Sequence, residues 1–179
     1  MRDASYRVAL GGIVASLCLI AMFLAGILPA FYLILPMIAG VLMMIIATEV
    51  STSWALLTYI AVSLLSLLIT ADKEAALIFI MLFGHYPILR FYLQKIRLGL
   101  VRFILKMMIF NVCVLSFFYI TVYIFGLKEM LEQFDDFGRY GGLIMLAVCN
   151  VIFILYDYNL EMFYYIYKKR LMPRFKRKK

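Results

Sequence analysis

The chain has 179 residues, of which 66% are hydrophobic and 16% are charged, and its mean hydropathy is +1.00. A soluble domain has about 45–50% apolar and about 25% charged residues, so this composition excludes an ordinary water-soluble domain and predicts an integral membrane protein. The formal net charge of +8 does not indicate nucleic-acid binding, because the basic residues cluster at the borders of apolar runs, where they set topology and contact anionic lipid.

Six apolar runs predict an all-α bundle of six transmembrane helices, since a membrane helix needs about 20 mainly apolar residues. In chain order the predicted spans are residues 8–28, 33–48, 54–69, 75–93, 98–125 and 142–167. Residues 1–167 then form the transmembrane domain, and residues 168–179 form a basic cytoplasmic tail. The first run is longer than the roughly 7–15 residues of a signal-peptide core, so it is interpreted as an uncleaved helix.

Short polar segments separate these runs. The segment Ser51-Thr52-Ser53 is predicted to cap the third helix, and Thr70 is a candidate cap for the fourth. The second and third runs are near the lower length limit, so the alternative that they form one hairpin that only dips into the membrane stays open.

The basic residues predict that both termini lie in the cytoplasm. With the N-terminus inside and six alternating spans, fifteen of the eighteen lysines and arginines fall on the inner side, eight of them in the tail. The outer side receives Lys73, Lys128 and Arg139. The inverted topology would reverse this distribution, against the excess of Lys and Arg in cytoplasmic loops. The sequence therefore predicts a multi-pass protein of the cell membrane whose inner border contacts anionic lipids.

No motif of a soluble enzyme occurs in the sequence, which has no Walker loop, no G-x-G-x-x-G and no H-E-x-x-H. The three cysteines, Cys18, Cys113 and Cys149, lie far apart within apolar runs and show no metal or redox spacing. We therefore expect no catalytic residue, no metal site and no cofactor. If the chain moves a solute uphill, partner proteins or an ion gradient must supply the energy.

Polar side chains inside the spans are the remaining candidates for function, because they are costly in hydrocarbon. His85, Asn111 and Asn150 lie at similar depths on the fourth, fifth and sixth spans, so they are candidate substrate-binding residues that floor a pocket in the outer half of the bundle. A kink at Pro87 would add a free backbone carbonyl at the same level. The alternative is a packing kink, with His85 bonded to a neighbouring helix.

Charged side chains in the inner half of the spans are predicted to form ion pairs within the membrane. They are Glu49, Arg90, Arg102, Lys106, Asp157 and Glu161. Asp157 and Glu161 are four residues apart, as are Arg102 and Lys106, so the members of each pair share a helix face. We expect Asp157 in particular to pair with one of the three cations. Structural pairing and a proton or solute pathway both remain open.

Small residues cover adjoining faces of the first helix, at Ala9, Gly11, Gly12, Ala15 and Ser16. Their spacing lets helices approach closely, either inside the bundle or against a partner protein. Between the fifth and sixth spans, apolar residues repeat at helical spacing over residues 127–134. This segment is compatible with a short helix on the outer surface and with a solvated loop.

Two sets of residues point to known proteins. The first set is the opening Arg7-Val8-Ala9-Leu10-Gly11-Gly12-Ile13-Val14-Ala15, the break at Pro29, and Pro36 with the pair Ala39-Gly40. With these features the chain resembles the S components of energy-coupling factor (ECF) transporters. The second set is an Asp-Lys-Glu-Ala-Ala turn followed by Phe-Gly-His-Tyr-Pro. This set is similar to small uncharacterised six-helix membrane proteins of Gram-positive bacteria.

The resemblance to S components implies a substrate-binding subunit for the uptake of a small, vitamin-like solute. Its partners would be a coupling membrane subunit and ATPases. The alternative interpretation is a scaffold or assembly protein of the cell envelope without transport activity, because small six-helix shape-determining proteins of bacteria are similar in size and similarly poor in motifs.

Overall fold

The structure is a computed structural model that describes residues 4–124, 126 and 140–171, and these residues form helices and short connections without a strand. Among them are five stretches long and apolar enough to span a membrane, which are α1 (Ala4–Ile27), α3 (Thr52–Ile69), Lys73–Leu93, Gly99–Ile124 and Gly141–Lys169. The prediction of an all-helical chain is confirmed for the described residues, with five helices of the length and apolarity that a membrane crossing needs.

The remaining predicted span, the second in chain order, corresponds to α2 (Ile34–Glu49), which is apolar but has only 16 residues. At 1.5 Å per residue it is about 24 Å long, which is shorter than the roughly 30 Å hydrocarbon core of a bilayer. Local thinning of the bilayer or snorkelling of flanking side chains accommodates such a short helix at modest cost. Five spans therefore follow from length and composition, and a membrane crossing by α2 stays a prediction.

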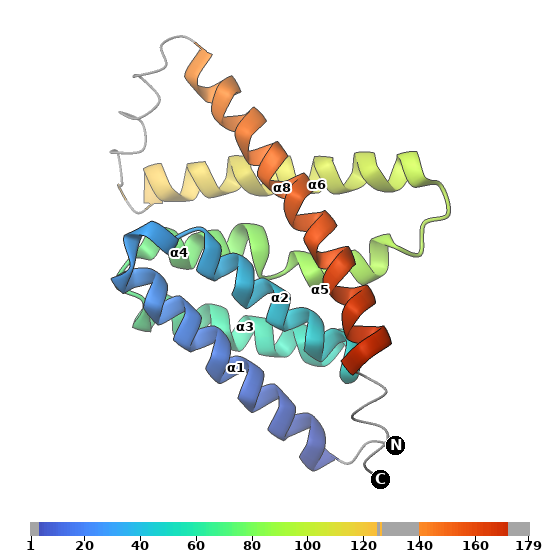
Figure 1. Cartoon of the computed structure of the whole chain (residues 1–179). Coiled ribbons are helices and arrows are strands. Elements are labelled where there is room, and N and C mark those ends of the chain that lie inside the picture. The colour runs from blue at the N-terminus through green and yellow to red at the C-terminus, as the bar shows by residue number, and fades with distance from the viewer. Residues whose placement is uncertain (1–3, 125, 127–139, 172–179) are drawn as a thin grey trace.

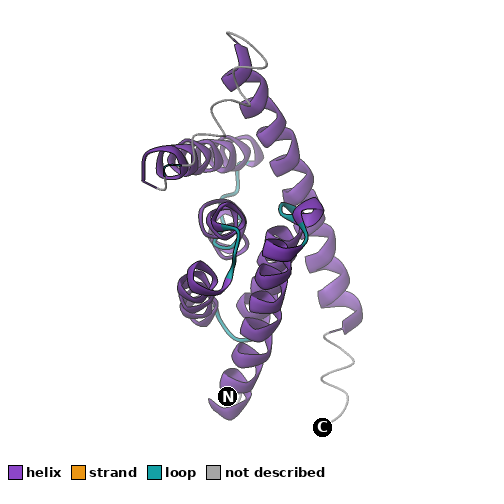
Figure 2. Cartoon of the chain, turned by 90° about the vertical axis from the view of Figure 1, so that its left-hand side faces the viewer, coloured by secondary structure: helices purple, strands orange, loops and turns teal. Residues whose placement is uncertain are grey.

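The helices form two layers that cross each other (Figure 1, Figure 2). One layer holds α3, the broken segment Lys73–Leu93, and α6 (Gly99–Tyr119) with η3 (Ile120–Ile124). The other holds α1, α2, and α8 (Gly141–Ile166) with η5 (Tyr167–Leu171), while η1 (Pro29–Phe31) lies in the turn between α1 and α2. Consecutive helices run in opposite directions, so the start of α1 and the end of α8 lie at the same end of the molecule.

Polar side chains satisfy the backbone groups at both ends of α3 and at the start of α4 (Lys73–Ile78). The predicted cap of α3 is confirmed, because Ser51 Oγ accepts a hydrogen bond from the Trp54 amide at 3.3 Å. The cap of α4 is Asp72 rather than Thr70, and its carboxylate accepts from the amides of Glu74 and Ala75 at 2.9 and 3.3 Å. Lys73 Nζ donates to two carbonyls at the end of α3, each at 2.8 Å. A lysine at this place satisfies acceptors that a helix end leaves open.

The segment Lys73–Leu93 is broken near its centre, as Pro87 predicts. The missing amide hydrogen of Pro87 removes the usual donor to the Phe83 carbonyl. The Tyr156 hydroxyl on α8 donates to this carbonyl at 3.3 Å instead. Gly40 on α2 packs against the same point, where an added Cβ would lie 2.5 Å from the Phe83 oxygen. The break is therefore filled by a side chain and by a closely packed glycine.

Just before the break, η2 (Phe79–Phe83) is one turn of π-helix. The Gly84 amide donates to the Phe79 carbonyl, five residues back, at 2.7 Å. This register leaves the Ile80 carbonyl without the donor that an α-helix would supply. The Tyr59 hydroxyl on α3 donates to it at 2.7 Å, and His85 Nδ1 lies 3.3 Å from it. The free carbonyl expected beside His85 is thus absent, because tyrosines from α3 and α8 occupy the acceptors at the kink.

Two apolar clusters form the core. One lies among α1, α2, α3 and the segment that follows, and includes Val14, Cys18, Met22, Met43, Val62 and Phe79. The other joins α5 (Tyr86–Leu93), α6 and α8, and includes Phe83, Tyr86, Phe110, Phe153 and Tyr156. Both α6 and α8 also carry exposed apolar side chains on their outer faces, such as Leu115 and Leu143. An outward apolar face is expected for a helix surrounded by lipid.

Two further predictions concern the ends of the last span. The possible surface helix at 127–134 lies outside the described residues, as does the tail beyond residue 171. The predicted span ended at residue 167, but the helix continues as η5 to Leu171. The first part of the predicted tail therefore extends the last helix, with Lys168 and Lys169 lying over the rings of Tyr164 and Tyr165.

Candidate functional site

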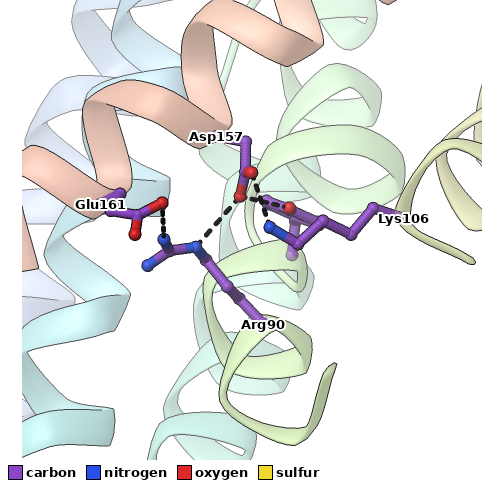
Figure 3. A network of polar contacts seen from close by, with 5 residues as sticks. Arg90, Lys106, Asp157 and Glu161 are labelled. Carbon is purple, nitrogen blue, oxygen red and sulfur yellow. Dashed lines mark hydrogen bonds and ion pairs between the residues drawn. The ribbon is translucent and has the colours of Figure 1, made fainter. Parts of the chain in front are cut away.

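A cluster of charged side chains joins α5, α6 and α8 (Figure 3). Arg90 Nε lies 3.0 Å from Asp157 Oδ1, and Lys106 Nζ lies 2.6 Å from Asp157 Oδ2. Arg90 also places a terminal nitrogen 3.2 Å from Glu161 Oε2. Both cations are buried, whereas Glu161 is largely exposed. Two cations and two carboxylates compensate one another, which reduces the cost of placing charge inside the bundle.

Two uncharged residues of α5 complete the cluster. Tyr86 donates its hydroxyl to Asp157 Oδ1 at 2.6 Å. Gln94, with its amide oxygen turned toward the guanidinium, accepts from the two terminal nitrogens of Arg90 at 3.2 and 3.1 Å. Each lies four residues from Arg90, so all three share one face of the helix. We did not predict Tyr86 or Gln94 from the sequence, although this spacing around a membrane arginine was a signal that could have identified them.

The structure brings together four of the six charged residues expected in the inner half. Arg102 is half-buried and forms no ion pair with the carboxylates of this cluster, whereas Arg90 from α5 pairs with both of them. Glu49 lies elsewhere, at the end of α2, where it is buried and accepts from the Tyr167 hydroxyl at 3.0 Å. The predicted pairing of Asp157 with one of the three cations is therefore confirmed, with Arg90 and Lys106 as its two partners.

A second polar contact joins α6 to α8. Asn111 and Asn150 face each other, and each amide nitrogen donates to the other's oxygen, at 3.0 and 3.1 Å. Each amide also donates to the carbonyl four residues earlier on its own helix, at 2.7 and 2.8 Å. Reciprocal amide pairs of this kind hold membrane helices together. Both side chains are thus engaged, and neither presents its donors to a cavity.

His85 contacts residues of α3 and α6 other than this asparagine pair. Its Nε2 is 3.7 Å from Cys113 Sγ on α6, and its ring meets Tyr59 of α3 edge-on at a centroid distance of 6.3 Å. The predicted pocket floor of His85, Asn111 and Asn150 is therefore corrected. The three residues have similar depths along their helices, but the rotation of each helix separates the histidine from the asparagines.

The small residues of α1 also divide between two faces. Gly11 is buried and faces Thr58 of α3. A Cβ added at Gly11 would lie 3.8 Å from the Thr58 hydroxyl oxygen. Ala15 is partly buried, in the core cluster shared with α2 and α3. Ala9, Gly12 and Ser16 are exposed, and nothing lies within 4 Å of a Cβ added at Gly12. One part of the set therefore serves packing inside the bundle, and the other forms an outward face.

A groove of about 530 Å³ lies between the first turns of α3 and the length of α5. It is lined by Thr52, Ser53, Leu56, Leu57, His85, Ile88, Leu89 and Tyr92. At one end, the hydroxyls of Thr52 and Tyr92 are 2.9 Å apart. Leu57 is 61% exposed and Tyr92 is 51% exposed, so the groove is open along the side of the bundle. Its volume is in the range of small-molecule sites, about 300–1,000 Å³.

In the described part of the chain, no group of three or more His, Cys, Asp or Glu side chains is arranged to hold a metal ion. Comparison with known protein families, with curated proteins and with solved structures gave no match to this chain.

Proposed function

We propose that the chain is a substrate-binding membrane subunit for the transport of a small solute, energised by partner proteins. The observation that carries this proposal is the groove between α3 and α5, because it combines a ligand-sized volume with apolar walls and a few polar groups. The solute site is thereby moved from the outer half of the bundle, where the sequence indicated it, to the side of α5.

The proposal includes six crossings with both termini in the cytoplasm, as the distribution of basic residues indicates. In this topology the Thr52–Tyr92 end of the groove lies at the inner border of the membrane. The charged cluster lies in the same half and holds α5 to α6 and α8. A solute taken up from outside would reach the groove through a conformation in which these helices are arranged differently.

The outward face of Ala9, Gly12 and Ser16 supports the involvement of a partner. Small residues at this spacing allow another transmembrane helix to approach the α1 backbone closely. A coupling membrane subunit with its ATPases is the partner that the resemblance to S components implies. Replacing Gly12 by Leu should then weaken the association with such a subunit and leave solute binding intact.

Native mass spectrometry of the full chain, purified in mild detergent, tests solute binding. We expect a bound small molecule on the wild-type protein and its loss in Leu89→Trp, which fills the groove from a half-buried position of its wall. The matched control is Leu115→Trp, at a position of α6 that is 62% exposed, and this variant should retain the ligand. Absence of any small molecule from the wild-type protein would contradict the proposal.

A scaffold or assembly protein of the cell envelope is the second candidate. It is favoured because the charged side chains of the cluster pair with one another, and the two asparagines pair with each other. Polar groups engaged in this way stabilise the bundle itself. The same experiment separates the two functions, because a scaffold would copurify with a stoichiometric protein partner and carry no small ligand that Leu89→Trp displaces.

A further inference from the structure

We propose that the ligand of the α3–α5 groove is an anionic amphiphile, a membrane lipid whose phosphate-bearing head group lies at the Thr52–Tyr92 end and whose apolar chain follows the groove toward His85. This inference rests on the proposed function, in that it names the class of ligand that the groove would bind. It is carried by the distribution of polarity along the groove, by the charge at one end, and by the open side.

The groove is polar at one end and apolar along the rest of its length. Thr52, Ser53 and Tyr92 bring three hydroxyl groups to one end. The walls beyond are leucines and one isoleucine. From Tyr92 to His85 the groove extends over seven residues of one helix, which is about 10 Å at 1.5 Å per residue. This length accommodates the upper part of an acyl chain.

His85 does not make the far end polar. Its Nδ1 lies 3.3 Å from the Ile80 carbonyl, and its Nε2 lies 3.7 Å from Cys113 Sγ. Both ring nitrogens are therefore engaged by the protein rather than directed to a ligand. A water-soluble solute with polar groups on all sides would leave those groups unpaired at this end, at a considerable cost in free energy. A chain that is polar at one end only fits the site.

Positive charge lies at the polar end. Lys95 follows Tyr92 by one turn, and its Nζ is 5.2 Å from the centroid of the Tyr92 ring. The first turn of α3, capped by Ser51, begins at the same end, and its positive dipole adds to the attraction for an anion. The cluster around Arg90 is electrically compensated and does not compete for the head group. A phosphate head group complements this end of the groove.

The open side gives a lipid direct access. Leu56, Leu57 and Tyr92 form the rim and are 46%, 61% and 51% exposed. A ligand dissolved in the bilayer can enter between α3 and α5 without crossing the bundle. In this conformation a solute from the outer aqueous phase has no such route along the apolar rim, because its hydration would be lost before its polar groups reached Thr52.

The test uses the full chain in lipid nanodiscs that contain equal amounts of phosphatidylglycerol and phosphatidylcholine, followed by native mass spectrometry. We expect the wild-type protein to retain phosphatidylglycerol in preference to phosphatidylcholine. Leu89→Trp should lose it, and Lys95→Gln should lower its retention about fivefold, the effect of one cation at a membrane surface. The matched controls Leu115→Trp and Lys168→Gln should behave like the wild type, since Lys168 also lies over a tyrosine ring but belongs to η5, which does not line the groove.

The outcomes separate this inference from the proposed function. Phosphatidylglycerol retained equally by all variants would place the lipid elsewhere and overturn the inference. A polar small molecule without a chain, lost only in Leu89→Trp, would overturn the inference while supporting solute binding in the groove. Retention of no ligand of either kind would contradict both. Thermal melting of each variant shows that a loss of ligand is not a loss of fold.

Discussion

Lys106 and Asp157 form an ion pair between α6 and α8, with Lys106 Nζ 2.6 Å from Asp157 Oδ2. The other oxygen of the same carboxylate receives Arg90 and the Tyr86 hydroxyl from α5. One carboxylate thus connects three helices. Its removal would leave two buried cations without their principal partner, which is far more costly than the loss of an exposed ion pair.

We predict that Asp157→Asn lowers the free energy of unfolding by about 3–5 kcal/mol. Thermal melting in detergent should show a correspondingly lower midpoint. Combining it with Lys106→Met should cost less than the sum of the two single changes, with a coupling of about 0.5–3 kcal/mol, because the second change removes the cation that the first left unpaired. Arg102→Gln is the control, since Arg102 lies outside the cluster, and it should cost less than about 1 kcal/mol. Strict additivity would contradict the assignment.

Removal of one member of the Asn111–Asn150 pair should also destabilise the protein, although the groups are uncharged. Asn111→Leu should lower the free energy of unfolding by about 1–2 kcal/mol, because it leaves the Asn150 amide without its partner on α6. Adding Asn150→Leu should cost little more, since no unpaired amide then remains. If either asparagine instead served a solute, the double variant would lose ligand with its melting temperature unchanged, which is the result that would refute a structural role.

Gly40 and Gly12 provide a matched comparison of two helix glycines. A Cβ at Gly40 would lie 2.5 Å from the Phe83 carbonyl oxygen, whereas nothing lies within 4 Å of one at Gly12. Gly40→Ala should therefore destabilise the protein by about 1–3 kcal/mol. Gly12→Ala should be neutral or stabilising by up to about 1 kcal/mol, because alanine favours the helix. Equal melting temperatures for the two variants would show that α2 does not pack against the break as described.

Tyr156 should be needed for the break at Pro87 to remain stable. Tyr156→Phe removes the hydroxyl that donates to the Phe83 carbonyl, and leaving a buried acceptor unsatisfied costs about 1–3 kcal/mol. Tyr158→Phe, two residues along and 68% exposed, is the control and should change stability little. Restoring a donor by Pro87→Ala in the Tyr156→Phe background should recover part of the loss. A failure to recover any of it would mean that the loss does not arise at the Phe83 carbonyl, and an unchanged stability of Tyr156→Phe would mean that the tyrosine acts by packing alone.

The helices could be predicted from the sequence because apolar runs and their interruptions mark them. The predicted spans 54–69 and 98–125 compare with Thr52–Ile69 and Gly99–Ile124 in the structure. Ser51 and Pro87 gave the start of α3 and the break before α5, since each acts through local backbone chemistry. Thr70 was predicted to cap α4, but Asp72 does so. Both residue types have a high propensity for the N-cap position, and both lie in the same short turn.

The sites could not be predicted to the same extent, because they depend on helix rotation. A span that is apolar on all sides carries no pattern that tells which face meets a neighbour. Depth alone grouped His85 with Asn111 and Asn150, and rotation placed the histidine against Cys113 and the groove. The groove itself combines a helix start near Thr52 with residues near Tyr92, forty positions later, and their proximity follows only from the packing of α3 on α5.

Cysteine labelling of the topology tests the account most directly, because the place of the groove and of the charged cluster in the inner half depends on six crossings. In a chain whose three cysteines are replaced, single cysteines would be placed at three exposed positions, Ser53, Ala71 and Arg97. We predict that a membrane-impermeant maleimide labels Ala71→Cys in intact cells and labels Ser53→Cys and Arg97→Cys only after the membrane is permeabilised. Labelling of Arg97→Cys in intact cells would show that the topology is inverted. A Ser53→Cys that reacts in neither condition would show that α2 and α3 form a hairpin that does not cross the membrane.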